Sequence, residues 1–459
     1  MSVVMKFGGT SVADADAMAR LAAIVRRQIE KQEARNNAES RPPVVVVSAL
    51  SKVTDGLLEV ARLIENGDRD GATSRLNDLV DRHVAVASGV ASGARLAAVI
   101  RDVRADFVAL TDMVRALAAL HEVSPRLLDA VAATGELASS RIVAAALAEA
   151  GVPAAWVDAR QVIVTDAEYT CAVPDMAATG ARAQRTIASV TRRGEVAVLG
   201  GFIGATAEGV TTTLGRGGSD YSAAIAGACL DVDEIQIWTD VDGMLTADPR
   251  VVPEPRVVPQ LSFAEASELA YFGAKVLHPS TILPAVSKNI PVRILNSRRP
   301  DNPGTLITAN PQPADGHLTA IACKRDVTVI DITSSRMLMA HGFLRRLFEV
   351  FERFKTAVDV VTTSEVSVSV TVDDTRRLDA IVDNLRGFAD VACEREMAII
   401  CAVGEDIHED PKAFGRALAA LDAIPLRMVS QAASRRNITF VLRDSDVPEA
   451  MMRLHDMFF

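Results

Sequence analysis

Apolar runs alternate with amphipathic stretches up to about residue 306. Short runs rich in β-branched residues predict buried strands, and longer stretches with apolar residues three and four apart predict helices. The predicted strands are residues 2–7, 43–48, 154–157, 196–199 and 234–238, and residues 57–150 predict a layer of helices. Strands that alternate with helices favour a mainly parallel sheet covered by helices.

A different pattern follows the linker-like, proline-rich stretch 310–316. Residues 327–393 predict the order strand, helix, strand, strand, helix, strand, and residues 397–457 repeat this order without its last strand. The apolar segment 318–324 is the candidate for the missing strand. The predicted domains are 1–309, an inserted unit at 325–394, and a second unit made of 317–324 plus 395–459.

The stretch 211–221 carries three glycines ahead of a helix predicted over 222–229. The first N–H groups of a helix lack intrahelical partners and carry partial positive charge, so such a junction can bind an anion. Arg216 stands between the glycines, where a guanidinium can bind a carboxylate or phosphate, and Ser219 and Asp220 suit a helix start. A capped helix after a flexible turn would produce the same pattern.

A second candidate anion site lies at the N-terminus. Lys6 stands near the end of the first predicted strand and precedes Gly8 and Gly9, and a helix is predicted from about Asp14. The spacing of a Walker loop is absent, because the lysine precedes its glycines. The alternative is a strand-edge lysine with its ammonium group in water.

Polar residues also follow other predicted strands. Ser48 and Thr54 come after the second strand, where hydroxyl groups line ligand crevices or simply cap helices. Glu136 stands beside a glycine at what the pattern indicates is a helix start, where a carboxylate usually serves the helix dipole. Hydroxyl and acidic groups from Thr239 and Asp240 onward suit a nucleotide, or a turn held by aspartate side chains.

Composition restricts the partners. The 459 residues allow two to four domains, and a net charge of −10 argues against an extended nucleic-acid or anionic-membrane surface. Five scattered cysteines indicate neither a zinc site nor a disulfide framework. No apolar run approaches the roughly twenty residues of a membrane span, and no signal peptide is evident. We therefore expect a cytoplasmic protein with no nucleic-acid and no membrane partner.

Four ordered motifs together resemble the aspartate kinases: residues 6–11, 213–220, 238–240 and 272–279. The C-terminal repeats resemble the ACT regulatory domains of that family, so the resemblance covers nearly the whole chain. It implies an α/β amino-acid-kinase fold followed by two ferredoxin-like βαββαβ ACT domains. The implied activity is ATP-dependent phosphorylation of the β-carboxylate of L-aspartate, the entry step to lysine, threonine and methionine.

The resemblance also implies roles for single residues. The catalytic residues would be Lys6, Asp220 and Lys275. Around the substrate it places Ser48, Thr54, Glu136 on the α-ammonium, Arg216 on the α-carboxylate, and Ser219. Around the nucleotide it places Gly8, Gly9, Thr10, Thr239, Asp240, Gly243, Leu245, Asp248, Arg250 and Lys275. ATP and Mg²⁺ are the implied cofactors, without a metal site made of protein ligands alone, and Leu245 replaces an aromatic residue of many relatives.

In the regulatory part the resemblance is to lysine-sensing, single-function enzymes. The matching positions are Met337, Gly342, Phe343, Leu344, Val358, Asp359, Thr363 and Ser364. Ala340 and Ala357 replace serines of a lysine-inhibited relative, which removes two hydrogen bonds, yet lysine remains the expected effector. The apolar runs 366–372 and 397–403 are expected to be edge strands that pair two chains, so a homodimer or a dimer of dimers is expected.

Two other interpretations remain. A kinase of the same fold could act on glutamate, acetylglutamate or a nucleotide, but the paired ACT-like units and Glu136 argue against it. A non-catalytic amino-acid sensor would have a vestigial kinase domain. Four retained residues argue against that interpretation: Lys6, Arg216, Asp220 and Lys275.

Overall fold

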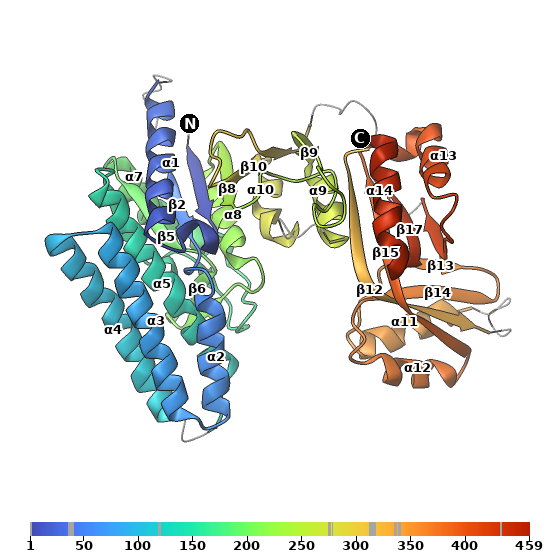
Figure 1. The fold of residues 1–459 in the computed structure, drawn as a ribbon. Coiled ribbons are helices and arrows are strands. Elements are labelled where there is room, and N and C mark those ends of the chain that lie inside the picture. The colour runs from blue at the N-terminus through green and yellow to red at the C-terminus, as the bar shows by residue number, and fades with distance from the viewer. Residues whose placement is uncertain are drawn as a thin grey trace. The chain divides into compact units, whose positions relative to one another are not determined.

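The computed structural model describes residues 2–34, 41–117, 121–273, 277, 279–311, 318–334, 337, 341–431 and 434–459, with only the backbone of Arg115 and Leu117. The chain divides into two compact units (Figure 1). The first unit comprises residues 1–244 and 276–311, and the second comprises residues 245–275 and 312–459. The sequence places residues 245–275 in the first predicted domain, whereas they pack with the second unit.

A mainly parallel sheet organises the first unit, as predicted. Its strands run in the order β3, β5, β2, β1, β8, β10, β11, and each pair is parallel except β10 with β11. The strands are β1 (Val3–Phe7), β2 (Val44–Val47), β3 (Ala154–Val157), β5 (Val196–Gly200), β8 (Glu234–Thr239), β10 (Val292–Asn296) and β11 (Thr305–Thr308). Every residue of β1, β2 and β5 is buried, which explains their continuous apolar runs.

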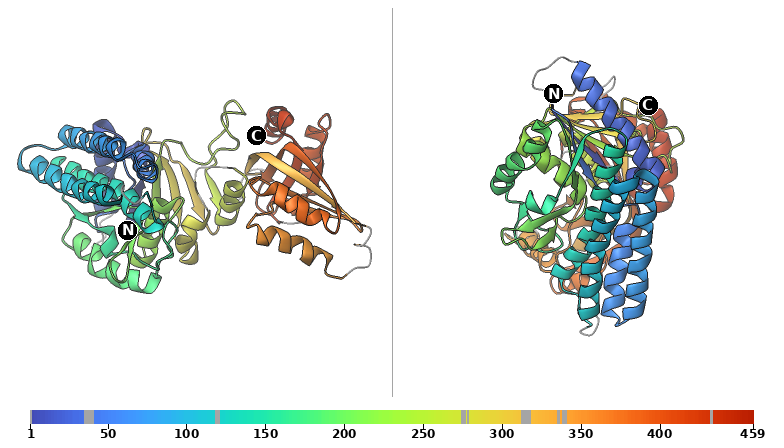
Figure 2. Two further views of the ribbon diagram at one scale, coloured as in Figure 1. Left: turned by 90° about the horizontal axis from the view of Figure 1, so that it is seen from below. Right: turned by 90° about the vertical axis from the view of Figure 1, so that its left-hand side faces the viewer.

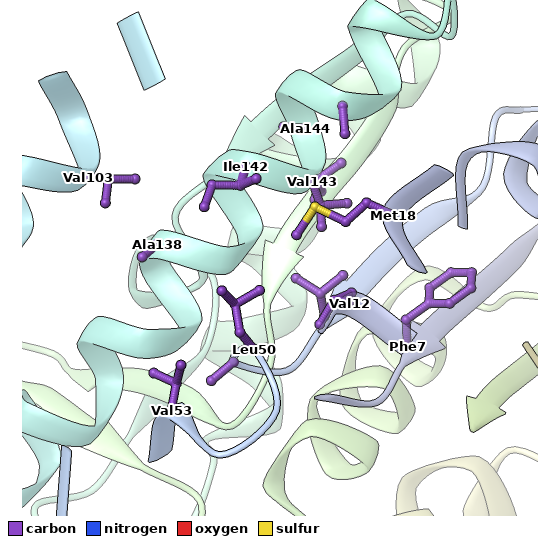
Figure 3. Packing of buried hydrophobic residues seen from close by; sticks show 14 of the residues in the cluster. Phe7, Val12, Met18, Leu50, Val53, Val103, Ala138, Ile142, Val143 and Ala144 are labelled. Carbon is purple, nitrogen blue, oxygen red and sulfur yellow. The ribbon is translucent and has the colours of Figure 1, made fainter. Parts of the chain in front are cut away.

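Long helices pack together beside this sheet, where the sequence predicts a helical layer (Figure 2). They are α1 (Ala15–Ala34), α2 (Val53–Glu65), α3 (Arg69–Val90), α4 (Gly93–Leu117) and α5 (Pro125–Glu149). Polar caps set two of their starts: Asp68 accepts a hydrogen bond from the N–H of Gly71, and Ser124 accepts one from the N–H of Leu127. The central helix of the first unit's core is α5, whose Ala138, Ile142 and Val143 share a cluster with Phe7 and Met18 (Figure 3).

Helix α5 corrects one expectation from the sequence. It is long and apolar enough to cross a membrane by length and composition, although no apolar run of that length was expected. However, 89% of its apolar window is buried inside the protein. Such burial is typical of the core helix of a soluble protein, because a helix that is apolar on all sides needs neighbours on all sides.

The remaining elements of the first unit are a small second sheet and shorter helices, of which α8 packs against β1, β2 and β8. A small sheet contains β4 (Val164–Thr165), β6 (Ile203–Thr206) and β7 (Thr211–Thr213). The helices are α6 (Met176–Arg185), α7 (Ile187–Arg192), α8 (Gly218–Leu230) and α10 (Leu283–Ser287), with 3₁₀ turns η1 (Gly9–Val12), η2 (Ala159–Gln161) and η3 (Pro279–Ile282). Buried Asp129 of α5 accepts hydrogen bonds from the N–H and hydroxyl of Thr213, which attaches β7 to α5.

The second unit contains one antiparallel sheet in the order β13, β14, β12, β15, β17, β16. Its strands are β12 (Ala320–Thr333), β13 (Val361–Thr363), β14 (Ser367–Val372), β15 (Asp390–Val403), β16 (Met428–Ser430) and β17 (Asn437–Arg443). Its helices are α9 (Phe263–Tyr271), α11 (Phe343–Arg353), α12 (Leu378–Arg386), α13 (Pro411–Ala420) and α14 (Val447–Phe458); β9 (Gln260–Ser262), η5 (Ile407–Glu409) and η6 (Asp444–Asp446) complete it.

Two long strands join the predicted repeats. The first part of β12, Ala320 to Lys324, pairs with Ile399 to Val403 of β15. This is the pairing expected if segment 318–324 supplies the missing strand of the second repeat. The bounds of the three predicted domains stay a prediction. The expected edge strands are wrong, because β14 lies between β13 and β12, and β15 lies between β12 and β17. Residues 368–370 of β14 and 399–403 of β15 are paired on both sides, so the backbone groups of these residues are not available to a second chain.

Candidate active site

The two candidate anion sites of the sequence meet in the structure. Lys6 of β1 extends its Nζ to 2.7 Å from Oδ1 of Asp220, which lies in the first turn of α8. The two side chains are 11% and 14% exposed. A Cβ at Gly8 would lie 3.7 Å from the same Nζ, so the glycine leaves space beside the ammonium group. This arrangement contradicts the alternative of a strand-edge lysine whose ammonium group lies in water.

Glycines bring the start of α8 close to the sheet. Gly217 precedes the helix with a φ of 69°, a left-handed conformation that glycine adopts without strain. A Cβ at Gly201, just after β5, would lie 2.8 Å from Cα of Ser219. The helix begins at Gly218, several residues before the predicted 222, and the N–H groups of Gly218 and Asp220 donate to the carbonyls of Gly215 and Gly217. The geometry therefore provides a cation beside the positive end of a helix dipole.

Glu136 is the second charged group of the site. It lies eleven residues after the start of α5 and not at a helix start, so its predicted role at a helix dipole is wrong. The N–H of Ala49 donates to its Oε1 at 3.3 Å, and its Oε2 has no hydrogen-bond partner among the described residues. Burial raises the pKa of Glu136 to about 8, because the hydrogen bonds that favour the charged form are too few to compensate. A buried carboxyl group with one free oxygen is suited to bind a cation.

The loops after β1 and β2 pack against each other beside these groups. The N–H of Ser48 donates to the carbonyl of Phe7, and the N–H of Ser51 donates to the carbonyl of Gly9. A Cβ at Gly9 would lie 3.0 Å from the carbonyl oxygen of Ala49, so a larger residue would separate the loops. Thr10 lies in η1 and Thr54 is the second residue of α2, while Arg216 is exposed.

The predicted nucleotide residues of the first unit follow β8. The carbonyl of Thr239 accepts hydrogen bonds from the N–H and the hydroxyl of Ser297. The Thr239 hydroxyl donates to exposed Asp240, and Gly243 has a φ of 143°. The side chain that holds this turn belongs to a residue without a predicted role.

That residue is Asp242. Its carboxylate lies 2.6 Å from Arg299 and accepts hydrogen bonds from Asn296 and Asn302. An aspartate side chain, that of Asp242, therefore holds this turn, which is one of the two alternatives that the sequence left open. The nucleotide contacts of Thr239 and Asp240 stay predictions. The partners of Asp242 lie more than fifty residues away in sequence, which is why local pattern could not reveal them.

Three other nucleotide candidates belong to the second unit. Leu245 forms an isolated bridge with Val257, and Asp248 accepts hydrogen bonds from the backbone N–H and guanidinium of Arg250. The guanidinium holds two oxygens of one carboxylate, a rigid arrangement that presents Arg250 at the surface. The fourth candidate, Lys275, lies outside the described residues.

The predicted regulatory residues surround the start of α11 and the strand that follows it. Gly342 precedes α11 with a φ of 85°, and Leu344 in the first turn is exposed. Three further residues are partly buried against the core of the first repeat: Met337, Phe343 and Val358. Thr363 ends β13, and the hydroxyl of Ser364 lies 2.7 Å from that of Ser367. Asp359 has a buried carboxylate that is paired with a cation.

A polar cavity of about 480 Å³ lies elsewhere, between α1 and the first residues of β8 and β10. Its buried side chains bind one another: Gln236 donates to Glu234 at 2.8 Å, and the indole N–H of Trp238 donates to Gln236 at 3.1 Å. Lys6, Asp220 and Glu136 do not line it. The volume of this cavity is therefore no guide to the chemical site.

Comparison with known proteins identifies the family. Residues 1–296 match the model of the amino acid kinase family, and residues 400–458 match that of an ACT domain. The lysine-sensitive aspartokinase 3 of Escherichia coli is 35% identical over 470 residues, which cover 100% of this chain and 99% of that protein. The chain belongs to the aspartokinase family. A chloroplastic aspartokinase 3 of Arabidopsis thaliana is also 35% identical, over 100% of this chain and 82% of that protein.

Solved structures agree with this family. E. coli aspartokinase III in complex with aspartate and ADP matches with a TM-score of 0.82 at 34% identity, over 100% of this chain and 99% of that one. The enzyme in complex with lysine and aspartate matches with a TM-score of 0.80 at 35% identity and the same coverage. The predicted amino-acid-kinase fold with ACT domains is confirmed, as is the class of enzyme.

Proposed function

We propose that the chain transfers the γ-phosphoryl group of ATP to the β-carboxylate of L-aspartate. The observation that carries the proposal is the Lys6–Asp220 pair at the junction of two glycine turns. The E. coli enzyme that was solved with aspartate and ADP supports the choice of substrates.

The site suits a transfer that needs no general base. The β-carboxylate of aspartate is already ionised at pH 7, so the barrier comes from alignment and from repulsion between anions. Lys6 would neutralise charge on the transferring group, with Asp220 holding its ammonium in place. Glu136 would bind the substrate ammonium and Arg216 its α-carboxylate. Ser48, Thr54 and Ser219 would complete the substrate site.

The nucleotide would bind across the remaining predicted positions. These positions are Gly8, Gly9, Thr10, Thr239, Asp240, Gly243, Leu245, Asp248, Arg250 and Lys275. Among the described residues no group of three or more acidic, cysteine or histidine side chains could hold a metal ion. Mg²⁺ would enter with the ATP phosphates, since Mg²⁺ commonly keeps phosphate and water ligands. When bound, Mg²⁺ would offset phosphate charge.

Feedback control by lysine is the proposed role of the second unit. The E. coli relative solved with lysine supports this effector. Two exposed apolar side chains one turn apart on α11, Leu344 and Phe348, support a homodimer through that helix. A dimer of dimers would need a further interface.

A colorimetric assay tests the activity. Hydroxylamine converts an acyl phosphate to a coloured hydroxamate, so the signal must require both ATP and aspartate. Activity with aspartate and not with glutamate supports the proposal. Preference for glutamate would favour another kinase of this fold, and no turnover with any acceptor despite amino-acid binding would favour the non-catalytic sensor.

A further inference from the structure

Helix α9 is attached to the regulatory sheet along one face. Glu268 and Tyr271 are three residues apart and are therefore neighbours on the helix surface. Asn437 of β17 donates a hydrogen bond to Glu268 at 2.7 Å, and the Tyr271 hydroxyl donates to Oδ1 of Asp359 at 2.8 Å. The C-terminal end of α9 is thus held by a residue from the proposed effector site.

This helix also leads directly to a proposed catalytic residue. It lies within residues 1–296, which match the kinase family model, yet it packs with the regulatory unit. Just after it, Gly273 has a φ of 116°, and a Cβ there would lie 2.2 Å from the carbonyl oxygen of Cys323 in β12. Lys275 follows two residues later in the sequence. The end of α9 is therefore close in sequence to a proposed catalytic residue.

The Asp359 carboxylate already forms an ion pair with a lysine of the same chain, Lys324. Nζ of Lys324 lies 2.7 Å from Oδ1 of Asp359 and 2.7 Å from Oδ2 of Asp373. The Asp359 side chain is 1% exposed, and its Oδ2 has no hydrogen-bond partner among the described residues. The same ammonium group lies 5.0 Å from the ring centroid of Tyr271. Asp359, Lys324 and Tyr271 therefore form one cluster, which we call the Asp359 cluster.

The titration behaviour of the cluster agrees with tight pairing. Burial by itself lowers the pKa of Lys324, but the hydrogen bonds to Asp359 and Asp373 outweigh it, and the pKa is raised. Burial, the hydrogen bond to Asp359 and its negative charge raise the pKa of the Tyr271 hydroxyl. Lys324 is therefore a cation and Tyr271 a neutral donor at physiological pH.

We propose that Lys324 is an internal competitor of the amino-acid effector for Asp359, and that Tyr271 transmits the exchange to α9. This inference rests on the proposed lysine site. When an ammonium group of the effector binds the Asp359 carboxylate, it replaces the ammonium group of Lys324. The Asp359 carboxylate then no longer accepts the hydrogen bond from the Tyr271 hydroxyl. The freed end of α9, a helix within the residues that match the kinase family model, then lowers the rate of phosphoryl transfer.

The exchange is physically plausible because no charge is left buried alone. Removing a cation from a buried carboxylate is strongly unfavourable, but one ammonium group replacing another keeps Asp359 paired. Lys324 keeps a second carboxylate, since Asp373 is 42% exposed and can hold it nearer to solvent. The unpartnered Oδ2 of Asp359 provides an additional acceptor for the incoming group. A neutral effector side chain offers no such replacement.

Two variants of the full-length chain test the proposal. Tyr271→Phe removes the hydroxyl and keeps the ring, and Lys324→Met removes the competing ammonium. Arg325→Met is the matched control, because Arg325 is the next residue on β12 and pairs with Asp444. For each protein, lysine binding is measured by calorimetry and kinase activity by the hydroxamate assay over a range of lysine concentrations.

Different effects are expected from the two variants. Lys324→Met should bind lysine about tenfold more tightly, and lysine should raise its melting temperature more than that of the wild type. Tyr271→Phe lacks the bond to Asp359 even without lysine, so its kinase activity without lysine should already be lowered, and saturating lysine should lower it further by a smaller factor than in the wild type. Arg325→Met should behave like the wild type in both assays.

Several results would overturn the proposal. They are unchanged lysine affinity in Lys324→Met, unchanged inhibition in Tyr271→Phe, or a wild-type chain that does not bind lysine. None of these concerns turnover without lysine, so the aspartate kinase activity is judged separately by the activity of the wild type in the absence of lysine.

Discussion

Lys6 shows how a single residue acquires a role from its neighbours. Its ammonium is largely buried, paired with Asp220 and adjacent to the space above Gly8. A cation held in this way does not need to reorganise when a phosphoryl group arrives, and such preorganised donors are a major source of rate enhancement.

Lys6→Ala is expected to lower kcat by about a hundredfold or more, the typical loss when one transition-state donor is removed. The hydroxamate assay measures the rate, and circular dichroism checks that the fold is retained. Lys288→Ala is the control, because Lys288 pairs with Asp231 on the surface. Near-normal turnover in Lys6→Ala would refute the proposed site.

Glu136 should release a proton when aspartate binds. Its raised pKa of about 8 keeps most of the carboxyl group protonated at pH 7, and an ammonium group beside it favours the charged form. Calorimetry in two buffers of different ionisation enthalpy measures the released proton. Glu136→Gln should release none and should raise the KM for aspartate about tenfold or more, the loss of one hydrogen bond between charged groups. Proton release unchanged in Glu136→Gln would exclude this role.

The same residue predicts how stability depends on pH. Between about pH 4.5 and pH 8 the unfolded chain has lost this proton while the folded protein still holds it. The folded state then binds more protons, so the free energy of unfolding falls as the pH rises through this range. Urea unfolding at pH 5 and pH 8 should show a smaller fall in Glu136→Gln than in the wild type. An equal fall in both proteins would mean that burial does not raise the pKa of Glu136.

At the scale of elements, the start of α8 depends on close approach to the end of β5. Gly201→Ala would place a methyl group 2.8 Å from the backbone of Ser219, so the helix start must move. Such overpacking costs about 1–3 kcal/mol of stability and should also lower activity, because Asp220 lies one residue further.

Gly415→Ala in α13 is the matched control for that variant. Apart from the helix's own nearby backbone, no atom of the described residues lies within 4 Å of the added methyl group, and alanine is the better helix former, so stability should rise by up to about 1 kcal/mol with unchanged activity. Urea unfolding and the hydroxamate assay separate the two cases. Full activity in Gly201→Ala would show that the helix start tolerates displacement.

At the scale of the whole molecule, the second unit should join two chains. Light scattering after size exclusion should give twice the 48.8 kDa of one chain, or four times that mass for a dimer of dimers. Phe348→Glu adds a charge to the exposed apolar surface of α11 and should shift the mass toward one chain. Val108→Glu is the control, because Val108 is exposed on α4 of the first unit and should leave the mass unchanged. A monomeric wild type would exclude the dimer.

Much of the fold followed from local pattern. The continuous apolar runs of β1, β2 and β5 predicted a buried parallel sheet, and the repeated order of elements predicted both ACT-like repeats. The glycine turns around Lys6 and Gly217 were recognisable because positive φ and close approach require residues that leave a signature in the sequence. Resemblance to the aspartate kinases then suggested roles that these patterns alone left open.

Other features depended on residues that are distant in the chain. Sequence could not show that α5 extends well before Glu136, that Asp242 holds the turn after β8, or that Lys324 occupies Asp359. The sequence by itself determined the segments with a strong pattern, such as β1, β2 and β5, since that pattern depends only on neighbouring side chains, whereas the shorter β6, β7, β10 and β11 were not predicted. Only the tertiary structure decided which charged groups are buried and paired, because burial and pairing depend on the segments that pack together.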